Sequence, residues 1–265
     1  MTERRGANVT SRRGMRAWGV LAVGVLLAFG VPSATAEDGE ARGMVKRVMD
    51  ALPKVPFVAK LKLTTDQGGR EIRLSHKLVQ GARASYLEVV APESLQGMRF
   101  LFLERVGGLA EQYIKIAGAR NAVRVADQIR KQPFLESAFY VSDLVEPPLD
   151  VFTYRFTGEE QLLGRNCKLI EAVPKNPEEG VYGRTVVAVD PSDLLVLRRQ
   201  FFDGKGNLLK VWTIEKVEKI DGIWTLTQQR MENVQDHATS RLEVAEIKYN
   251  VELPDTMFAP TYLLR

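Results

Sequence analysis

The side chains that most often carry chemistry are few in this sequence and do not gather into a site. The chain has two histidines, His76 and His237, and a single cysteine, Cys167. Both histidines stand in strand-like stretches, and neither has a Cys, Asp or Glu at metal-ligand spacing. One cysteine cannot form an internal disulfide. We therefore predict that no metal is bound and that all three are ordinary strand residues.

Catalytic motifs are absent from the sequence as well. It contains no G-x-S-x-G, no H-E-x-x-H, no C-x-x-C and no phosphate loop ending in Gly-Lys-Ser/Thr. Gly204 and Gly206 belong to a predicted hairpin, not to a dinucleotide fingerprint, and the paired acids Glu178 and Glu179 fall in a turn. The sequence thus predicts no catalytic residues, no cofactor and no enzymatic activity.

The first 36 residues have the layout of a secretory signal peptide. Arg12, Arg13 and Arg16 precede an apolar run at 17–31, and Ala34-Thr35-Ala36 offers small residues for cleavage after Ala36. The apolar run is shorter than the roughly 20 residues that a spanning helix needs, so a retained anchor helix is the weaker alternative. Sec and twin-arginine export both stay open. Because no cysteine follows the cleavage point, we expect a soluble periplasmic protein without a lipid anchor.

The net charge of the chain is concentrated in this leader segment. The whole chain has 37 Lys and Arg against 33 Asp and Glu. The first 36 residues hold five arginines and one acid, so their removal leaves no net charge. A nucleic-acid-binding role, which needs a basic face, therefore loses its main support. No Pro- or Ser-rich linker and no repeat divides residues 37–265, so we expect them to form one domain.

The stretch from Leu194 to Val251 predicts a long antiparallel meander. A glycine-rich reversal at 203–207 separates its first two alternating runs. Asp221-Gly222 then lies between two β-type runs, which favours a type I′ hairpin because both central residues need positive φ. Together with the alternating runs before it, the meander predicts about eleven strands in a single large, curved antiparallel sheet.

Two segments are predicted to contain helices. Apolar residues recur at helical spacing over 41–52, and Pro53 ends the pattern. The segment 118–148 interrupts the strands with a locally basic loop and an apolar cluster, and Pro147-Pro148 ends any helix there. We expect one or two short helices over the mouth of the sheet. The basic loop fits either a solvated loop or a contact with an anionic partner.

A strand predicted at 97–106 is apolar on both of its faces. Met98, Phe100 and Phe102 share one face, and Leu101 and Leu103 share the other. Such a strand must be covered on both sides. Either it runs through a two-layer core, or one of its faces lines an apolar cavity.

Several short motifs along the chain recur in one family. They are Pro92-x-x-Leu95-x-Gly97, Tyr113, Phe134, Ser137-Ala138-Phe139-x-x-x-Asp143-Leu144 and Pro254-Asp255-x-x-Phe258. With a signal peptide and about 230 residues of long strands, this pattern resembles the outer-membrane lipoprotein-sorting proteins, the LolA/LolB-like superfamily of periplasmic carriers. The resemblance covers nearly the whole mature chain.

The chain also departs from the pattern of that family. The family often has Gly-Ser-Asp-Phe-x-Tyr-x-Asp-Leu, but here Glu136 replaces the glycine, Ala138 the acid and Val141 the tyrosine. Lys115 stands where a proline is usual after Tyr113. We expect the fold to survive these changes and the identity of the ligand to be open to change.

The resemblance implies a mainly β fold, a half-open barrel capped by short helices. Its concave apolar face would hold acyl chains of a lipid or lipoprotein, received from an inner-membrane transporter and passed to an outer-membrane acceptor. The predicted cavity or lid residues are Met98, Phe100, Phe102, Phe139 and Leu144.

Two other functions are compatible with the sequence. An envelope interaction module that binds no lipid would dock on a membrane transporter or assembly factor, and it would have a solid core. A hydrolase with an unrecognised site would need Ser, Asp or His groups that face a pocket. Alternation cannot decide which strand face is concave, because a register slip of one residue exchanges the two faces.

Overall fold

The computed structural model describes residues 34–105, 108–126, 129–178 and 180–264. Its strands are β1 (Phe57–Thr65), β2 (Gly68–Val79), β3 (Ala82–Ala91), β4 (Arg99–Arg105), β5 (Gly108–Lys115), β6 (Val123–Arg124), β7 (Phe152–Leu162), β8 (Arg165–Pro174), β9 (Arg184–Asp190), β10 (Leu195–Phe202), β11 (Leu208–Ile220), β12 (Ile223–Asn233) and β13 (Ala238–Tyr249). The predicted signal peptide spans residues 1–36, and its residues 1–33 lie outside the described residues.

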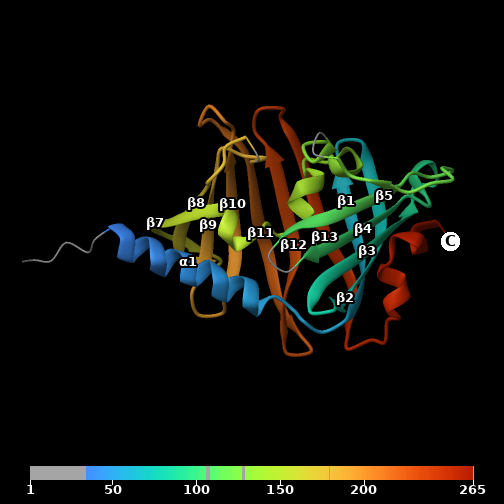
Figure 1. Cartoon of the computed structure of the whole chain (residues 1–265), viewed down its shortest axis with the longest axis horizontal. Helices are drawn as coiled ribbons and strands as arrows, with labels where there is room; N and C mark the ends of the chain where they lie inside the picture. Colours follow the sequence, from blue (N-terminus) through green and yellow to red (C-terminus); the bar gives the residue numbers. More distant parts are fainter. Residues whose placement is uncertain (1–33, 106–107, 127–128, 179, 265) are drawn as a thin grey trace, which may run out of the picture. The chain divides into compact units, whose positions relative to one another are not determined.

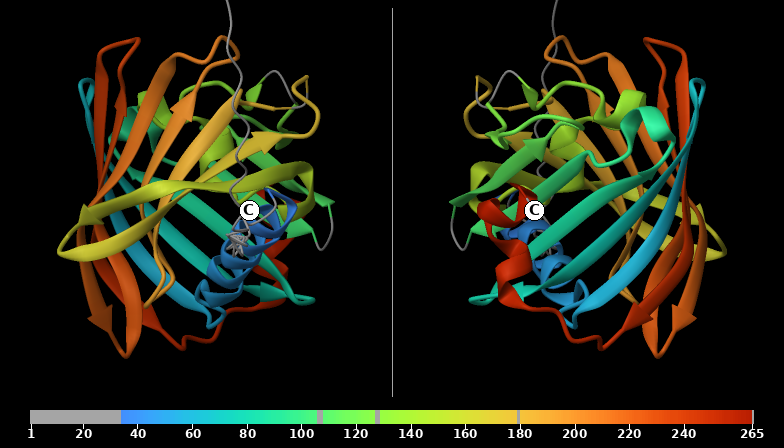
Figure 2. Two further views of the ribbon diagram at one scale, coloured as in Figure 1. Left: turned by 90° about the vertical axis from the view of Figure 1, so that its left-hand side faces the viewer. Right: turned by 90° about the vertical axis from the view of Figure 1, so that its right-hand side faces the viewer.

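All of these strands belong to one antiparallel sheet. The 13 strands run in the order β6-β5-β4-β3-β2-β1-β13-β12-β11-β10-β9-β8-β7 (Figure 1). Two runs of consecutive hairpins meet where β1 pairs with β13. The sheet is strongly curved (Figure 2) and is not closed, since β6 and β7 form its two edges.

The C-terminal meander follows the sequence prediction closely. Asp221 (φ 50°) and Gly222 (φ 81°) form the turn between β11 and β12, where Ile220 pairs with Ile223. Two positive φ angles in a two-residue turn match the type I′ hairpin that the Asp-Gly pair predicts.

The described residues form 13 strands, not about eleven. β6 has two residues, which is too short for any alternation to reveal, and it lies inside the segment predicted as loop and helix. Leu163 (φ 49°) and Gly164 (φ 73°) form the turn between β7 and β8. The apolar side chain of Leu163 hides this turn in the sequence.

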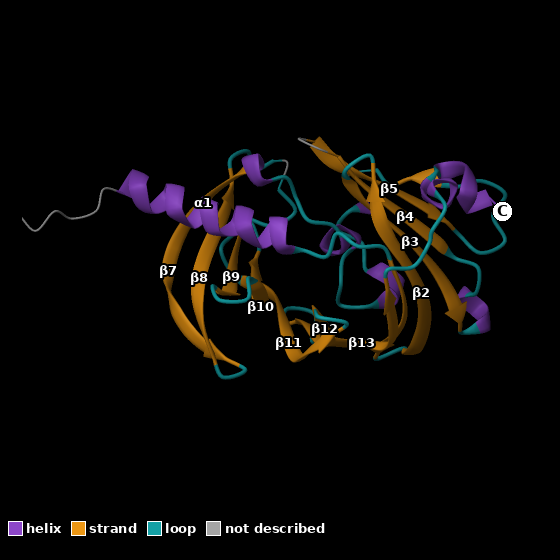
Figure 3. Ribbon diagram, turned by 90° about the horizontal axis from the view of Figure 1, so that it is seen from below, coloured by secondary structure: helices purple, strands orange, loops and turns teal. Residues whose placement is uncertain are grey.

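The described residues contain one α-helix, α1 (Ala34–Ala51), which starts earlier than the predicted 41–52. Residues 34–40 have no apolar repeat, so helical spacing could not reveal them. α1 lies beside β7 (Figure 3) and buries Ala41, Met44 and Val48 against strand residues that include Tyr154. None of the helices in the described residues is both long enough and apolar enough to cross a membrane.

The predicted helical caps are in fact short 3-10 turns. In the predicted segment 118–148 they are η3 (Phe134–Glu136) and η4 (Val141–Leu144). Further 3-10 turns of the described residues, which were not predicted, are η1 (Glu93–Leu95), η5 (Leu149–Val151), η6 (Asp255–Phe258) and η7 (Pro260–Leu264). Prolines at positions 133, 147 and 148 flank η3, η4 and η5 and prevent any of them from extending into a regular helix.

The connection between the two edge strands packs against the concave face of the sheet. We call residues 129–151 the crossing segment, because they lead from β6 at one edge to β7 at the other. Phe134 and Phe139 of this segment belong to a buried cluster with Phe100 and Phe102 of β4 and Met231 of β12. Figure 2 shows the segment, in yellow-green, on the inner side of the curved sheet.

The strand that is apolar on both faces is covered on both faces, as predicted. On the concave side, Phe100 and Phe102 pack against the crossing segment. On the convex side, Leu101 is fully buried with Phe258 and Leu263 of the C-terminal turns η6 and η7. The core of this half of the molecule is therefore solid on both sides of β4.

Candidate binding cavity

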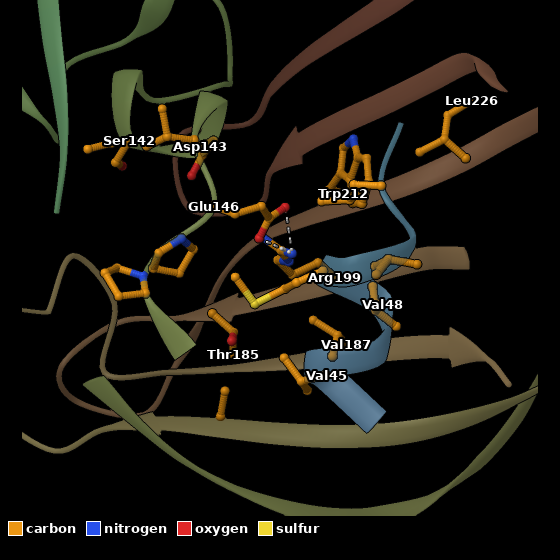
Figure 4. A pocket seen from close by; sticks show the side chains of 18 of the residues that line it. Val45, Val48, Ser142, Asp143, Glu146, Thr185, Val187, Arg199, Trp212 and Leu226 are labelled. Atoms are coloured by element: carbon orange, nitrogen blue, oxygen red, sulfur yellow. Dashed lines mark hydrogen bonds and ion pairs between the residues drawn. The ribbon is translucent and has the colours of Figure 1, made fainter. Parts of the chain in front are cut away.

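The concave side of the sheet holds a partly open cavity of about 1610 Å³. Pockets for drug-sized ligands usually measure about 300 to 1,000 Å³, so this cavity is suited to a larger ligand. Its walls come from strands on both sides of the β1–β13 junction, from α1 and from the crossing segment. Figure 4 shows part of the lining.

Most of the wall is apolar because alternate residues of neighbouring strands face it together. Ala59 of β1 pairs with Ile247 of β13, and Leu61 pairs with Val244, so each pair presents its side chains to the same side. The apolar lining includes Val45, Val48, Met49, Phe57, Leu74, Val187, Val189, Val196, Trp212, Leu226 and Leu242. Such a wall can hold hydrocarbon without any reactive group.

The five residues predicted from sequence lie beside this cavity and not on its wall. Phe100, Phe102 and Phe139 are 2%, 3% and 5% exposed in the buried cluster, and Met98 and Leu144 pack against that cluster. Phe134 of the crossing segment contacts Phe100 edge-on, with ring centroids 4.9 Å apart. The crossing segment therefore fills the concave space above β4, and the open space lies further along the sheet.

The wall residues that sequence reasoning missed lie on α1, on several strands of both halves of the sheet and in the meander. In the meander, Leu226 stands between Thr225 and Thr227, an alternation that indicates one buried face. That signal was visible, but alternation does not distinguish a face packed against solid core from a face that lines open space.

A buried ion pair attaches the crossing segment to the sheet. Lys210 of β11 and Asp143 of η4 are 0% and 4% exposed, and Lys210 Nζ lies 2.5 Å from Asp143 Oδ2. The backbone N–H of Tyr140 donates to Oδ2 at 2.7 Å, and the Tyr182 hydroxyl donates to Oδ1. Burial lowers the pKa of Lys210, although Asp143 opposes this shift, and burial raises the pKa of Tyr182.

A second attachment involves Glu136, one of the residues that depart from the family pattern. Leu135 and Glu136 have φ angles of 50° and 58°, a conformation that favours glycine. Glu136 pairs with Arg70, a buried side chain whose Nη1 also donates to Thr65 Oγ1 at 2.8 Å. Ser240 Oγ accepts the Ala138 N–H at 2.9 Å. Glu136 thus offsets backbone strain with an ion pair that glycine could not make.

One ion pair lies within the cavity itself. Arg199 Nη2 of β10 donates to both carboxylate oxygens of Glu146, at 3.3 and 3.2 Å (Figure 4). The Arg199 guanidinium carbon lies 6.0 Å from the centre of the Trp212 ring, at the outer range of a cation–π contact. The cavity therefore combines a largely apolar wall with an ion pair whose two members both line it.

The histidine and the cysteine that lie within strands occupy structural positions. The His76 ring stacks on Phe57 with centroids 4.8 Å apart, and its Nδ1 lies 2.9 Å from Ser85 Oγ. Burial, with a smaller contribution from Arg83, lowers the pKa of His76 to about 4. Cys167 is a buried free thiol of β8. The prediction of a strand position is wrong for His237, which is exposed in the turn before β13. Among the described residues, no three His, Cys, Asp or Glu side chains come close enough to hold a metal ion.

Comparison of structures finds more similar proteins than comparison of sequences does. A family model described as "Uncharacterized protein" matches residues 81–265. No curated protein sequence matches the chain. Solved structures, in contrast, match with high probability and over most of the chain.

Three of these structures illustrate the likeness. A domain described as an outer membrane lipoprotein-sorting protein, from Vibrio parahaemolyticus, has 20% identity and a TM-score of 0.79 over 86% of this chain and 100% of its own. A DUF1329 family protein from Desulfovibrio piger has 22% identity and a TM-score of 0.76, over 86% and 99%. A LolA superfamily protein from Nitrosomonas europaea has 18% identity and a TM-score of 0.64, over 84% and 98%. The mainly β fold with one large open antiparallel sheet, implied by the sequence resemblance, is confirmed.

Proposed function

Since this chain belongs to the family whose model spans residues 81–265, and since its fold is that of the lipoprotein-sorting proteins, we propose that it carries the acyl chains of lipids or lipoproteins. The observation that carries this proposal is the apolar cavity of about 1610 Å³. Burying an acyl chain is worth about 0.8 kcal/mol per methylene, or roughly 10 kcal/mol for one long chain before ordering costs.

The proposed carrier acts in the periplasm, after export and removal of residues 1–36. It shields acyl chains from water between an inner-membrane transporter and an outer-membrane acceptor. The name of the Vibrio parahaemolyticus domain, which refers to lipoprotein sorting at the outer membrane, supports this route.

The residues predicted from sequence keep a part in the proposal. Phe100, Phe102 and Met98 lie under the crossing segment, and Phe139 and Leu144 belong to it. Since none of the five lines the cavity, they would contact cargo once the crossing segment moves aside. The wall residues, such as Leu226 and Val187, would contact cargo directly.

The cavity favours the carrier over the interaction module. A module that docks on a transporter without binding lipid has no use for a large apolar cavity. Such a module is expected to have a solid core instead. The prediction that the chain is not an enzyme is a separate matter, which a screen with ester and phosphoester substrates checks.

A charged side chain placed in the wall tests the proposal. Leu226→Glu puts a carboxylate into the cavity, and it should abolish uptake of the neutral dye Nile red and of palmitate, because a charge in an apolar site is strongly disfavoured. Leu163→Glu is the matched control, since Leu163 is 49% exposed and outside the cavity lining. Both variants should keep the far-UV circular dichroism of the wild type. Undiminished uptake by folded Leu226→Glu would count against a lipid-binding cavity.

A further inference from the structure

The Arg199–Glu146 pair differs from the other ion pairs near the cavity. Both of its members line the cavity, which holds for no other ion pair among the described residues. The other charged wall residues that form ion pairs do so with side chains that do not line the cavity. Asp143 pairs with Lys210, Arg184 with Glu171, and Asp193 with Arg165. The partners of those three residues lie outside the cavity lining, whereas Arg199 and Glu146 both lie in it.

Glu146 uses only part of the hydrogen-bonding capacity of Arg199. Both contacts come from Nη2, while Nε is buried and has no hydrogen-bond partner. Nε and Nη2 form one edge of the planar guanidinium fork, which matches a carboxylate or phosphate that accepts from both nitrogens. A buried donor without a partner is unfavourable, so an anion that filled this edge would be bound better than Glu146 is.

The two partners also differ in how firmly they are held. The Arg199 side chain is 19% exposed and sits on a strand beside Trp212, whereas the Glu146 side chain is 35% exposed and belongs to the crossing segment. Glu146 can therefore turn toward water when another anion replaces it. Because one carboxylate is exchanged for another anion, the penalty of desolvating Arg199 has already been met in the empty protein.

We propose that Arg199 binds the anionic head group of the cargo and that Glu146 is its counter-ion while the cavity is empty. This rests on the proposed carrier function and narrows its cargo to amphiphiles with a carboxylate or phosphate close to the acyl chain. Val45, Val48 and Val187 lie around the ion pair (Figure 4), so the head and the first part of the chain would be bound in one place. Because Glu146 competes with the head group for Arg199, it lowers the affinity for the cargo and thereby assists its release.

The test compares two ligands that differ only in charge. Palmitate and palmityl alcohol have the same chain, and each is used to displace Nile red from the wild type and from Arg199→Gln, Glu146→Gln and Arg198→Gln. Arg198 is the matched control, because it neighbours Arg199 in the chain, pairs with Glu160 and does not line the cavity. Inorganic phosphate alone is titrated in parallel to distinguish a lipid head group from a free anion.

We expect Arg199→Gln to weaken palmitate binding by about tenfold or more, the loss typical of a charge-assisted hydrogen bond, and to leave palmityl alcohol unchanged. Glu146→Gln should tighten palmitate binding and Arg198→Gln should have no effect. If Arg199→Gln folds poorly, Arg199→Lys keeps the charge without the fork and should lose part of the preference for palmitate.

Each outcome separates this inference from the proposed function. Equal binding of palmitate and the alcohol, unaffected by Arg199→Gln, would overturn the head-group site and leave the carrier intact. Failure of both ligands to bind would overturn the carrier itself. Binding of inorganic phosphate alone that depends on Arg199 would overturn the assignment to a lipid head group.

Discussion

Lys210 Nζ of β11 lies 2.5 Å from Asp143 Oδ2 of η4, and the two residues are separated by 67 positions in the chain. The ammonium group also lies 3.5 Å from the centre of the Tyr140 ring. A fully buried charge on the sheet thus meets its counter-charge on the crossing segment. This contact attaches the crossing segment to β11 beside the cavity, which Asp143 itself helps to line.

Removing one partner of this pair should strongly destabilise the protein. Lys210→Met leaves Asp143 buried without its counter-ion, and we expect a loss of about 3 kcal/mol or more in the free energy of unfolding. The double variant Lys210→Met/Asp143→Leu should lose less than the sum of the two single variants. Urea denaturation measures all three.

An exposed ion pair provides the comparison for that experiment. Lys60 and Glu246 are each 62% exposed, so Lys60→Met should change stability by about 1 kcal/mol or less. Strict additivity of the Lys210 and Asp143 substitutions would show that the two buried charges do not depend on one another.

The stability of the protein should fall in mild acid because of His76. Its pKa is lowered from 6.5 to about 4 in the folded state, so the unfolded chain takes up a proton at higher pH than the folded chain does. Stability is therefore lost as the pH falls from about 6.5 toward about 4, by about 3 kcal/mol at the lower end. Unfolding free energies at a series of pH values measure this loss.

Substitution of the histidine should remove that dependence. In His76→Gln the slope between about pH 6.5 and pH 5 should flatten, because ordinary carboxylates titrate below this window. His237→Asn serves as the control, since His237 has a φ of 55° that Asn tolerates. The hypothesis is wrong if His76→Gln keeps the wild-type slope.

The single thiol should be unreactive in the folded protein. Cys167 is 1% exposed, and burial raises the pKa of its thiol, so the reactive thiolate is scarce. Labelling by a maleimide should be on the order of a hundredfold slower in buffer than in denaturant. Rapid labelling of the native protein would indicate that β8 opens readily.

Phe102 tests the sequence-based site prediction. It is 3% exposed in the cluster beneath the crossing segment, so Phe102→Ala should lower stability by about 3 to 5 kcal/mol. Phe102→Leu preserves most of the packing and isolates the effect on ligands. Weaker palmitate uptake by Phe102→Leu would support contact with cargo, and unchanged uptake would assign Phe102 to the core alone.

Local sequence signals predicted the strands and their turns well, but not the open space between them. Alternation placed Phe100 and Leu101 on opposite faces, and Asp221-Gly222 fixed a hairpin. Whether a face meets solid core or open cavity depends on where the crossing segment packs. That is decided by contacts between distant residues, such as Lys210 with Asp143 and Arg70 with Glu136, which no periodicity encodes.

The Arg199–Glu146 pair in the cavity could not be predicted from the sequence for a similar reason. Arg199 and Arg198 are adjacent arginines on one strand, and nothing in the sequence indicates that only Arg199 faces the interior. A bulge between Val196 and Arg198 shifts the register of β10 against β9, so a simple count of alternate residues fails there. Glu146, 53 positions away in the crossing segment, completes the pair.

The most direct test of the carrier function is the mass of the protein, with any bound lipid, after purification from the periplasm. The chain would be exported to a bacterial periplasm, purified without detergent, and analysed by native mass spectrometry together with lipid extraction. Our account predicts a near-stoichiometric bound amphiphile that carries acyl chains and an acidic head group. A protein of bare polypeptide mass that also takes up no fluorescent fatty acid would contradict it and favour the interaction module.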